Sequence, residues 1–353
     1  MGLREYIIRR LILFIFVLLG VAVLVFSIIQ LIPAEQRIIL YVTNPQHLTG
    51  SEIEKVIAKY HLRDPPIIQF FYWLDNILHG NFGLSRISHE PVLDAILSRW
   101  PATIEVVMFT FPPIVLVGIY LGIISAVHRD KPVDHAVRLF SLVGWALPTF
   151  WFALILIAIF AGWLHWLPAP SPRGRLSPEL YNQVVLGIGG QKIKLYTGIY
   201  TIDGILNGRL DVVADTIIHL ILPIITLTVV SVAGLARVMR SSMLEALMKG
   251  YTVTARAKGL KFKDVINKHV RRNALIPVVT LSALYVAGML NGLVITETVF
   301  RIGGLGRWAY ESAYQTDQAA IVAFSLFAAT MFVIANLIAD ILYAYIDPRI
   351  RLG

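Results

Sequence analysis

Residues Glu245–Thr280 read EALMKGYTVTARAKGLKFKDVINKHVRRNALIPVVT, a basic and weakly amphipathic segment held between two long apolar runs. Between Arg237 and Arg272 there are ten Lys or Arg side chains and two acids, Glu245 and Asp264. This local excess is nearly the whole formal charge of the chain, which is +9. A loop that concentrates charge between apolar runs predicts a membrane protein that meets a soluble partner there.

The composition is that of an integral membrane protein. Hydrophobic residues make up 57% of the 353 residues and charged residues 15%, against about 25% charged in soluble domains. The mean hydropathy is +0.70. There is no cysteine, which excludes disulfides and thiolate metal sites.

Six apolar blocks are long enough to span a bilayer, which takes about 20 helical residues. The first is too long for a signal peptide, so we expect a retained helix. The sequence therefore predicts an all-α, six-helix membrane domain over residues 1–353. The predicted spans are Leu11–Ile32, Ala102–Val127, Leu139–Trp163, Ile217–Ala236, Ala274–Val299 and Ala319–Ile346.

The distribution of Lys and Arg predicts the orientation. If both termini lie on one side, the loops of that side hold 18 of the 31 basic residues in less than half of the loop length. The positive-inside rule then places both termini in the cytoplasm. The outer segments are residues 33–101 and 164–216, and a cytoplasmic loop covers about 237–273. Within the second outer segment, Gln191–Ile199 alternates weakly and predicts a short strand.

Motifs for catalysis are absent from the sequence. No GxxxxGK[ST], HExxH or GxSxG is present, and the nine His residues are scattered. We therefore expect no nucleotide site, metal site, cofactor or catalytic residue in this chain.

Polar and ionisable groups inside the predicted spans have two interpretations. They hydrogen-bond between packed helices, or they form a polar patch on a solute pathway. Helix breakers such as Pro148 and Pro277 also have two interpretations. They produce local kinks that suit helix packing, or they let helices open and close around a pathway. The polar candidates in the last two spans are Asn291, Glu297, Asn336 and Asp340.

The basic loop predicts two short helices broken at Gly259, because glycine is unfavourable inside a helix. Asn273 is expected to cap the next span. Attraction to anionic lipid explains the charge alone. It does not explain the small residues Ala255, Ala257 and Gly259, which permit close approach of a partner backbone. These residues favour docking of a protein.

At this point the loop resembles that of inner-membrane permease subunits of ABC importers, in the dipeptide/oligopeptide/nickel group. Further resemblances to the first-permease type occur before the loop, at Asp64-Pro65 and Arg237, and after it, at Glu297-Thr298-Val299-Phe300. Gly250 and Gly303 depart from the family pattern, which usually has Asp and Pro there. The matching loop residues are Tyr251, Val253, Thr254, Ala255, Arg256, Ala257, Lys258, Gly259, Leu260, Val265, His269, Arg272, Asn273, Ala274 and Pro277.

The resemblance implies a type I ABC-importer permease fold without catalytic activity of its own. It implies a second homologous permease as heterodimer partner, two cytoplasmic ATPase subunits that hold ATP and Mg, and an extracellular solute-binding protein. No nucleic acid is expected. The implied ATPase-coupling residues are Glu245, Tyr251, Thr254, Ala255, Arg256, Ala257, Lys258, Gly259, Leu260, His269, Arg272 and Asn273.

The solute is expected to be a di- or oligopeptide. Aromatic residues in the outer segments also suit an oligosaccharide, and the group includes nickel importers. A self-sufficient channel or secondary carrier is the rival of another class. It predicts inverted repeats and intramembrane charge; the sequence shows no clear repeat and little charge within the spans.

Overall fold

The computed structural model describes residues 3–42, 49–290 and 293–346, and these ranges contain helices and no β-strand. The long helices are α1 (Leu3–Gln30), α5 (Val92–Val127), α6 (Pro132–Ala146), α10 (Leu210–Met248), α13 (Arg271–Leu290) and α16 (Gln318–Ile346). The short helices are α2 (Ala34–Arg37), α3 (Gly50–Lys59), α4 (Pro66–Leu78), α7 (Thr149–Leu156), α8 (Pro178–Tyr181), α9 (Tyr200–Leu206), α11 (Gly250–Ala257), α12 (Phe262–Asp264), α14 (Val294–Val299) and α15 (Leu305–Tyr314).

The all-α membrane fold is confirmed, with one span bent. Within the described ranges five helices are long and apolar enough to cross a membrane. A sixth span results if α6 and α7, bent by 103°, are counted together. The prediction of a single helix over Leu139–Trp163 was wrong. Leu147 precedes Pro148 and is extended, with ψ 123°, because proline disfavours a helical conformation in the preceding residue.

Two other predicted spans have different limits in the structure. Helix α10 has 39 residues, or about 58 Å, so it projects well beyond a hydrocarbon core of about 30 Å. The block Ala274–Val299 is divided: α13 ends at Leu290, and Val294–Val299 forms the separate helix α14. Hydropathy finds the apolar middle of a span and misses its polar extensions.

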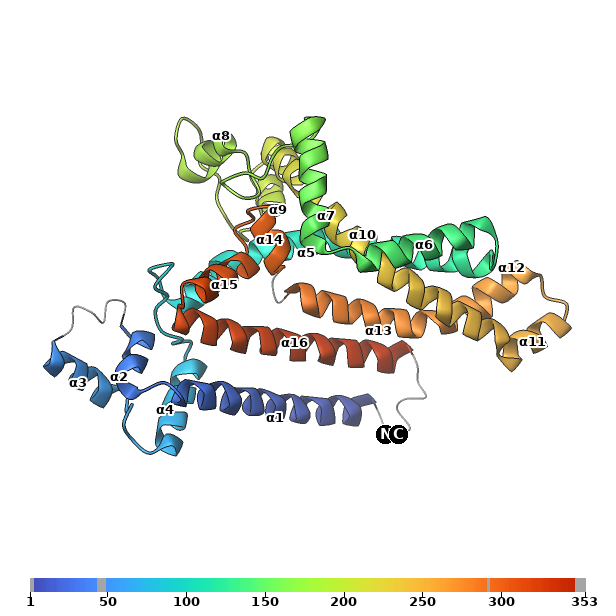
Figure 1. Ribbon diagram of the computed structural model, residues 1–353. Coiled ribbons are helices and arrows are strands. Elements are labelled where there is room, and N and C mark those ends of the chain that lie inside the picture. Colours follow the sequence, from blue (N-terminus) through green and yellow to red (C-terminus); the bar gives the residue numbers. More distant parts are fainter. Residues whose placement is uncertain (1–2, 43–48, 291–292, 347–353) are drawn as a thin grey trace.

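The long helices run side by side, and the short helices collect at the two ends (Figure 1). Helices α11 and α12 lie at one end, together with the described ends of α1 and α16. Helices α2, α3, α8 and α9 lie toward the other end. The first turn of α1 and the last turn of α16 therefore point to the same side as the basic loop (Figure 1).

Helix α10 packs most extensively against α5. Two glycines allow the close contact. A Cβ on Gly118 would lie 2.7 Å from Cδ2 of Leu235, and one on Gly122 would lie 2.5 Å from Cβ of Met239. Small residues bring membrane helices together in this way, so the α5–α10 pair is a tightly packed unit.

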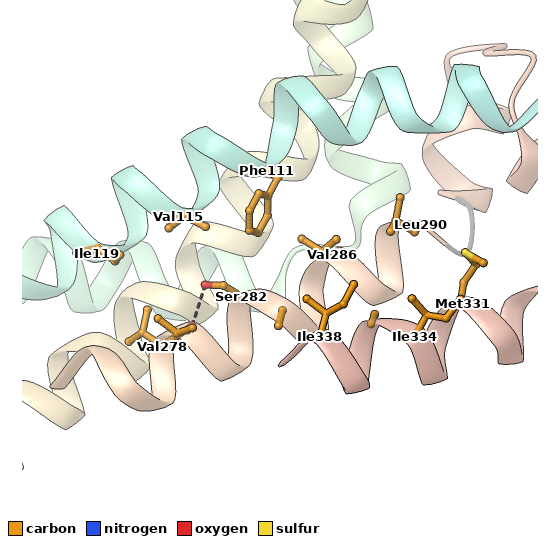
Figure 2. A pocket seen from close by; sticks show the side chains of 13 residues that line it. Phe111, Val115, Ile119, Val278, Ser282, Val286, Leu290, Met331, Ile334 and Ile338 are labelled. Atoms are coloured by element: carbon orange, nitrogen blue, oxygen red, sulfur yellow. Dashed lines mark hydrogen bonds between the residues drawn. The ribbon is translucent and has the colours of Figure 1, made fainter. Parts of the chain in front are cut away.

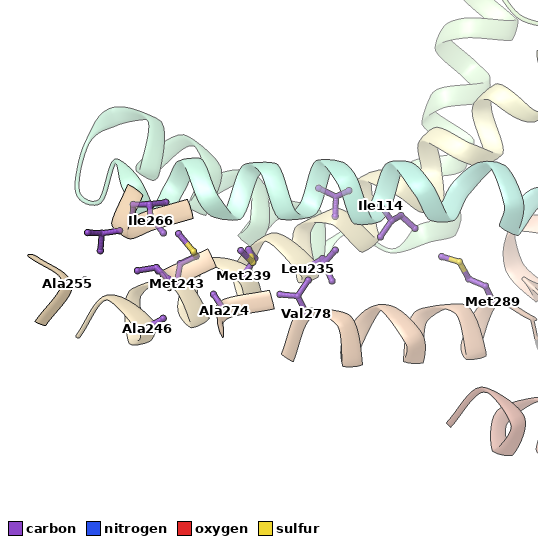
Figure 3. Close-up of a cluster of buried hydrophobic side chains, with 14 of the residues drawn as sticks. Ile114, Leu235, Met239, Met243, Ala246, Ala255, Ile266, Ala274, Val278 and Met289 are labelled. Carbon is purple, nitrogen blue, oxygen red and sulfur yellow. The ribbon is translucent and has the colours of Figure 1, made fainter. Parts of the chain in front are cut away.

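One apolar core joins the basic loop to the spans. It contains Leu235, Met239 and Met243 of α10 together with Ala255 of α11 and Val278 of α13, all buried (Figure 3). Val265, Ile266 and Val270, in the π-helical turn between α12 and α13, belong to the same core. A displacement of the loop therefore acts directly on α10 and α13.

The strand expected over Gln191–Ile199 is absent from the structure. The segment instead wraps around the carboxylate of Asp203, which accepts hydrogen bonds from the backbone N–H groups of Tyr196, Thr197 and Gly198 at 3.2, 3.0 and 2.9 Å. Because these N–H groups donate to one side chain, they are not available for the hydrogen bonds of a β-sheet. A weak alternation of apolar residues could not foresee that local partner.

Candidate functional site

The basic loop folds as a helix, a tight turn and a second helix. The turn follows α11, where Gly259 has φ +80°. Its N–H donates to Arg256 O at 2.9 Å, and Leu260 N donates to Ala255 O at 3.4 Å. This pattern is a Schellman motif, in which glycine supplies the left-handed residue after the helix. The predicted break at Gly259 is confirmed, and its cause is helix termination.

The structure separates the small residues of the loop into two groups. Ala255 is buried in the apolar core, so it supports the loop and does not meet a partner, contrary to the expectation. Ala257 and Gly259 are exposed. No atom lies within 4 Å of the position that a Cβ on Gly259 would take. The open side of the turn is thus free for another backbone.

Most of the predicted coupling residues lie on the surface of this loop and its flanking helices. His269 is half-buried. The exposed ones are Glu245, Tyr251, Thr254, Arg256, Ala257, Lys258, Gly259, Leu260, Arg272 and Asn273.

Asn273 does not begin a helix. A continuous helical segment runs from Phe262 to Leu290, and Asn273 lies inside it, with Nδ2 donating to His269 O at 2.7 Å. The expectation of an N-cap there was wrong because the polar loop residues before it are also helical. Pro277 follows four residues later and has no N–H for the Asn273 carbonyl.

Local pairs order the charged side chains of the loop. Glu245 Oε1 and Lys249 Nζ are 2.8 Å apart, and this hydrogen bond raises the pKa of the Lys249 ammonium. The Arg256 guanidinium lies over the ring of Phe262, 5.1 Å from its centroid. Both contacts join side chains within the loop itself, and exposed contacts of this kind are weak.

Exposed apolar side chains accompany the charges, and the sequence interpretation overlooked two of them. Met248 is 73% exposed, Val253 60%, Phe262 45% and Leu260 39%. Apolar groups within a basic, solvent-facing loop are typical of a protein-binding surface. Met248 and Phe262 could have been noticed in the sequence as large apolar residues inside a loop dominated by Lys and Arg.

Glu297 of α14 is fully buried, and both oxygens of its carboxylate accept hydrogen bonds. Its Oε1 accepts from Thr103 Oγ1 at 2.6 Å, and its Oε2 accepts from the Arg307 backbone N–H at 2.9 Å. A Cβ on Gly304 would lie 2.5 Å from this carboxylate. Glu297 thus caps the start of α15 and ties it to α5, as its packing interpretation predicted.

The other polar candidates are placed less completely. Asn291 lies outside the described residues. Asn336 and Asp340 lie on α16. Asn336 is half-buried, and the side chain of Asp340 is outside the described part. A role on a solute pathway stays a prediction for these three.

A cavity of about 340 Å³ lies between α5, α13 and α16 (Figure 2). Its lining is apolar apart from Ser282, whose hydroxyl donates to Val278 O at 2.8 Å. Neither Glu297 nor Asn336 lines it. Among the side chains that the structure describes, the cavity therefore offers shape and apolar surface and no charged group for recognition.

Two buried ion pairs were missed in the sequence. At the loop end, Asp134 is buried and accepts from Arg240 Nε and Nη2 at 2.7 and 2.8 Å and from Ser125 Oγ at 2.5 Å. At the other end, buried Glu105 pairs with Arg175. The partners are 106 and 70 residues apart. Only Glu105 carries a sequence signal, as a charge inside the predicted span Ala102–Val127; Asp134, Arg175 and Arg240 lie in predicted loops.

Comparison with known proteins agrees with this architecture. Residues 118–352 match the family described as the inner membrane component of binding-protein-dependent transport systems. The chain is 37% identical to the dipeptide transport system permease protein DppB of Alkalihalophilus pseudofirmus, over 98% of this chain and 99% of that protein. It is 35% identical to the oligopeptide transport system permease protein AppB of Bacillus subtilis, over 99% and 100%. It is 33% identical to DppB of Escherichia coli, over 98% of both. The chain therefore belongs to the family of inner membrane components of binding-protein-dependent transport systems.

Proposed function

We propose that this chain is the permease subunit of an ATP-driven importer and forms half of the translocation pathway for di- or oligopeptides. The similar proteins over nearly the full length are named as dipeptide and oligopeptide permeases. These names favour peptides over oligosaccharides and nickel. The apolar lining of the cavity between α5, α13 and α16 suits a transporter whose peptide substrates carry varied side chains.

The observation that carries this proposal is the two-sided construction of the loop. One side presents exposed residues such as Arg256, Lys258 and Val253. The opposite side, through Ala255 and Ile266, is buried in the core shared with α10 and α13. A partner that grips the exposed side moves the spans behind it. This is the construction that a coupling element needs.

The partners in this proposal are a second, related permease, two ATPase subunits and an extracellular solute-binding protein. ATP and Mg are held by the ATPase subunits, and this chain performs no catalysis. Both termini and the basic loop face the cytoplasm, where the excess of Lys and Arg belongs. Segments 33–101 and 164–216 face the binding protein on the outside.

Coupling follows from the packing. When the two ATPase subunits close on ATP, each draws one permease loop with it. Because α11 and the turn before α13 share a core with α5 and α10, the movement reaches the cavity between α5, α13 and α16. Closely packed cores respond to such a displacement as a unit. Access then changes from the outer to the inner side.

The test is reconstitution of the complete transporter in proteoliposomes. We expect ATPase chains to co-purify with this chain, and we expect loaded binding protein to accelerate ATP hydrolysis and uptake of a labelled dipeptide. Vesicles loaded with ADP serve as the control. Uptake of the dipeptide that is equally fast without ATP would contradict the proposal and favour a secondary carrier. Uptake of a labelled oligosaccharide in place of the dipeptide would overturn the solute assignment alone.

A further inference from the structure

A second cavity, of about 420 Å³, lies between α6 and α10 at the end of the molecule that carries the basic loop. Its lining is more polar than that of the first cavity and combines guanidinium and hydroxyl groups with short apolar walls. The lining residues are Val137, Arg138, Ser141, Leu142, Ala236, Arg237, Arg240 and Ser241.

The lining contains three arginines and no acid. The nearby carboxylate of Asp134 is bound to Arg240 through two hydrogen bonds, at 2.7 and 2.8 Å. Its distance to Nε of Arg138 is longer, 3.7 Å, and the Arg138 side chain is 43% exposed. The carboxylate of Asp134 therefore contacts two of the three guanidinium groups, and a second acid, Asp130, lies beside it with its N–H donating to Asp134 Oδ2 at 3.0 Å. The cavity keeps an excess of positive charge.

Arg237 stands out among the three. Within the part of the chain that the structure describes, it forms no ion pair, and it donates one hydrogen bond, from Nη2 to Ser141 O at 3.2 Å. Its guanidinium lies 5.9 Å from the ring centroid of Trp145. An arginine has five N–H donors, so most of them stay available. A charged side chain in a membrane helix ordinarily has a partner of opposite charge.

The apolar blocks of the sequence place this cavity at the predicted boundary between hydrocarbon and head groups. Arg138 directly precedes the apolar block that begins at Leu139, and Arg237 directly follows the apolar block that ends at Ala236. The two boundaries come from helices far apart in the sequence, and they meet at this cavity. In the predicted topology, hydrocarbon therefore begins on one side of the arginines and water on the other.

The outer wall of the cavity is suited to acyl chains. On α6, Leu139 is 62% exposed, Leu142 63% and Trp145 58%. Leu142 also lines the cavity, so the apolar surface continues into the basic site. A ligand that fits both parts carries a negative head and a hydrocarbon tail.

We propose that this cavity binds the phosphate of an anionic phospholipid head group. Arg237 and Arg138 bind the phosphate oxygens through charge-assisted hydrogen bonds, and Ser141 and Ser241 add hydroxyl donors. The acyl chains lie along Leu142 and Trp145. Basic pockets between membrane helices recognise anionic lipids by this chemistry. The inference rests on the membrane topology proposed above and is independent of which solute is transported.

The test is native mass spectrometry of the purified transporter after exchange into phosphatidylglycerol/phosphatidylcholine mixtures. We expect the wild type to retain phosphatidylglycerol. Arg237→Gln is expected to retain about tenfold less of it, because one charged hydrogen bond is lost. Arg237→Lys, which keeps the charge, is expected to retain an intermediate amount. The matched control is Lys263→Gln, which removes an exposed charge in the loop outside the cavity and is expected to leave retention unchanged.

Two results would overturn the proposal. One is equal retention by Arg237→Gln and Lys263→Gln, which would assign lipid attraction to the overall charge of the loop. The other is complete displacement of the lipid by inorganic phosphate at millimolar concentration, which would identify a site for free anions. A thermal unfolding curve for Arg237→Gln that matches the wild type excludes misfolding as the cause of a loss. If Arg237→Gln unfolds at a lower temperature than the wild type, the lipid retention of Arg237→Lys is compared with that of the wild type instead.

Discussion

Replacing Gly259 with Trp is expected to reduce the amount of ATPase that co-purifies with this chain at least tenfold, and to abolish transport. The indole would extend from an exposed turn into space that is empty of protein atoms within 4 Å of the new Cβ. That space is where the proposed ATPase groove approaches the chain. A loss of about 1.4 kcal/mol of binding free energy already corresponds to a factor of ten in affinity. The steric cost of an indole inside the interface is expected to be larger than this. Densitometry of the purified complex measures the result.

Two controls separate bulk from backbone strain. Gly259→Ala introduces the same positive-φ penalty without bulk, at a cost of about 1 kcal/mol, and is expected to keep most of the ATPase. Gly208→Trp places the same side chain at another open glycine, with φ +68° and no atom within 4 Å, between α9 and α10 at the opposite end. It is expected to leave ATPase retention unchanged. Equal damage from Gly259→Ala and Gly259→Trp would attribute the loss to a disrupted turn.

Replacing Arg175 with Ala is expected to destabilise the second outer segment by about 3–5 kcal/mol, the effect of leaving a buried charge without its partner. Glu105 is fully buried in α5 and binds Arg175 together with the N–H and hydroxyl of Thr201, both at 2.7 Å. The guanidinium also covers the ring of Tyr200, 4.2 Å from its centroid. Limited proteolysis within residues 164–216 and the thermal unfolding midpoint measure the effect.

Arg173 supplies the matched control, two residues away. It lies on the surface with its guanidinium 5.1 Å from the ring centroid of Tyr181, and Arg173→Ala is expected to change the unfolding free energy by less than about 1 kcal/mol. Similar protease sensitivity in both variants would contradict the anchoring role of the Glu105–Arg175 pair. The outer segment would then be held by its other contacts, such as Ser177 N to Asp215 Oδ2 at 2.7 Å.

The apolar blocks were sufficient to predict the order of the membrane helices, and their number of six holds if the bent pair of α6 and α7 is counted as one span. They did not predict the direction of the chain at Pro148, since a proline indicates a break and the angle of 103° depends on what α7 packs against. The extension of α10 to Met248 was also missed. Beyond the hydrocarbon core a helix needs no apolar character, because water solvates its side chains.

The helix–turn–helix of the loop was predictable because a glycine break is a local property of the backbone. The burial of Ala255 was not, since a small residue suits both a core and an interface. The pairs of Asp134 with Arg240 and of Glu105 with Arg175 join residues from distant parts of the chain. The sequence locates Glu105 within a predicted span and the other three charges in predicted loops, and only the packing of the helices selects the partner of each.

The most direct measurement of the central claim is site-specific cross-linking, for which the chain is well suited because it contains no cysteine. Lys258→Cys places a single thiol at the end of α11, and Lys192→Cys places one in the second outer segment; both positions are exposed. With a short thiol–amine cross-linker in the assembled transporter, Lys258→Cys is expected to form a product with an ATPase chain, and Lys192→Cys is not. Absence of the ATPase product at Lys258, with the product present at Lys192, would contradict the assignment of this loop as the coupling element.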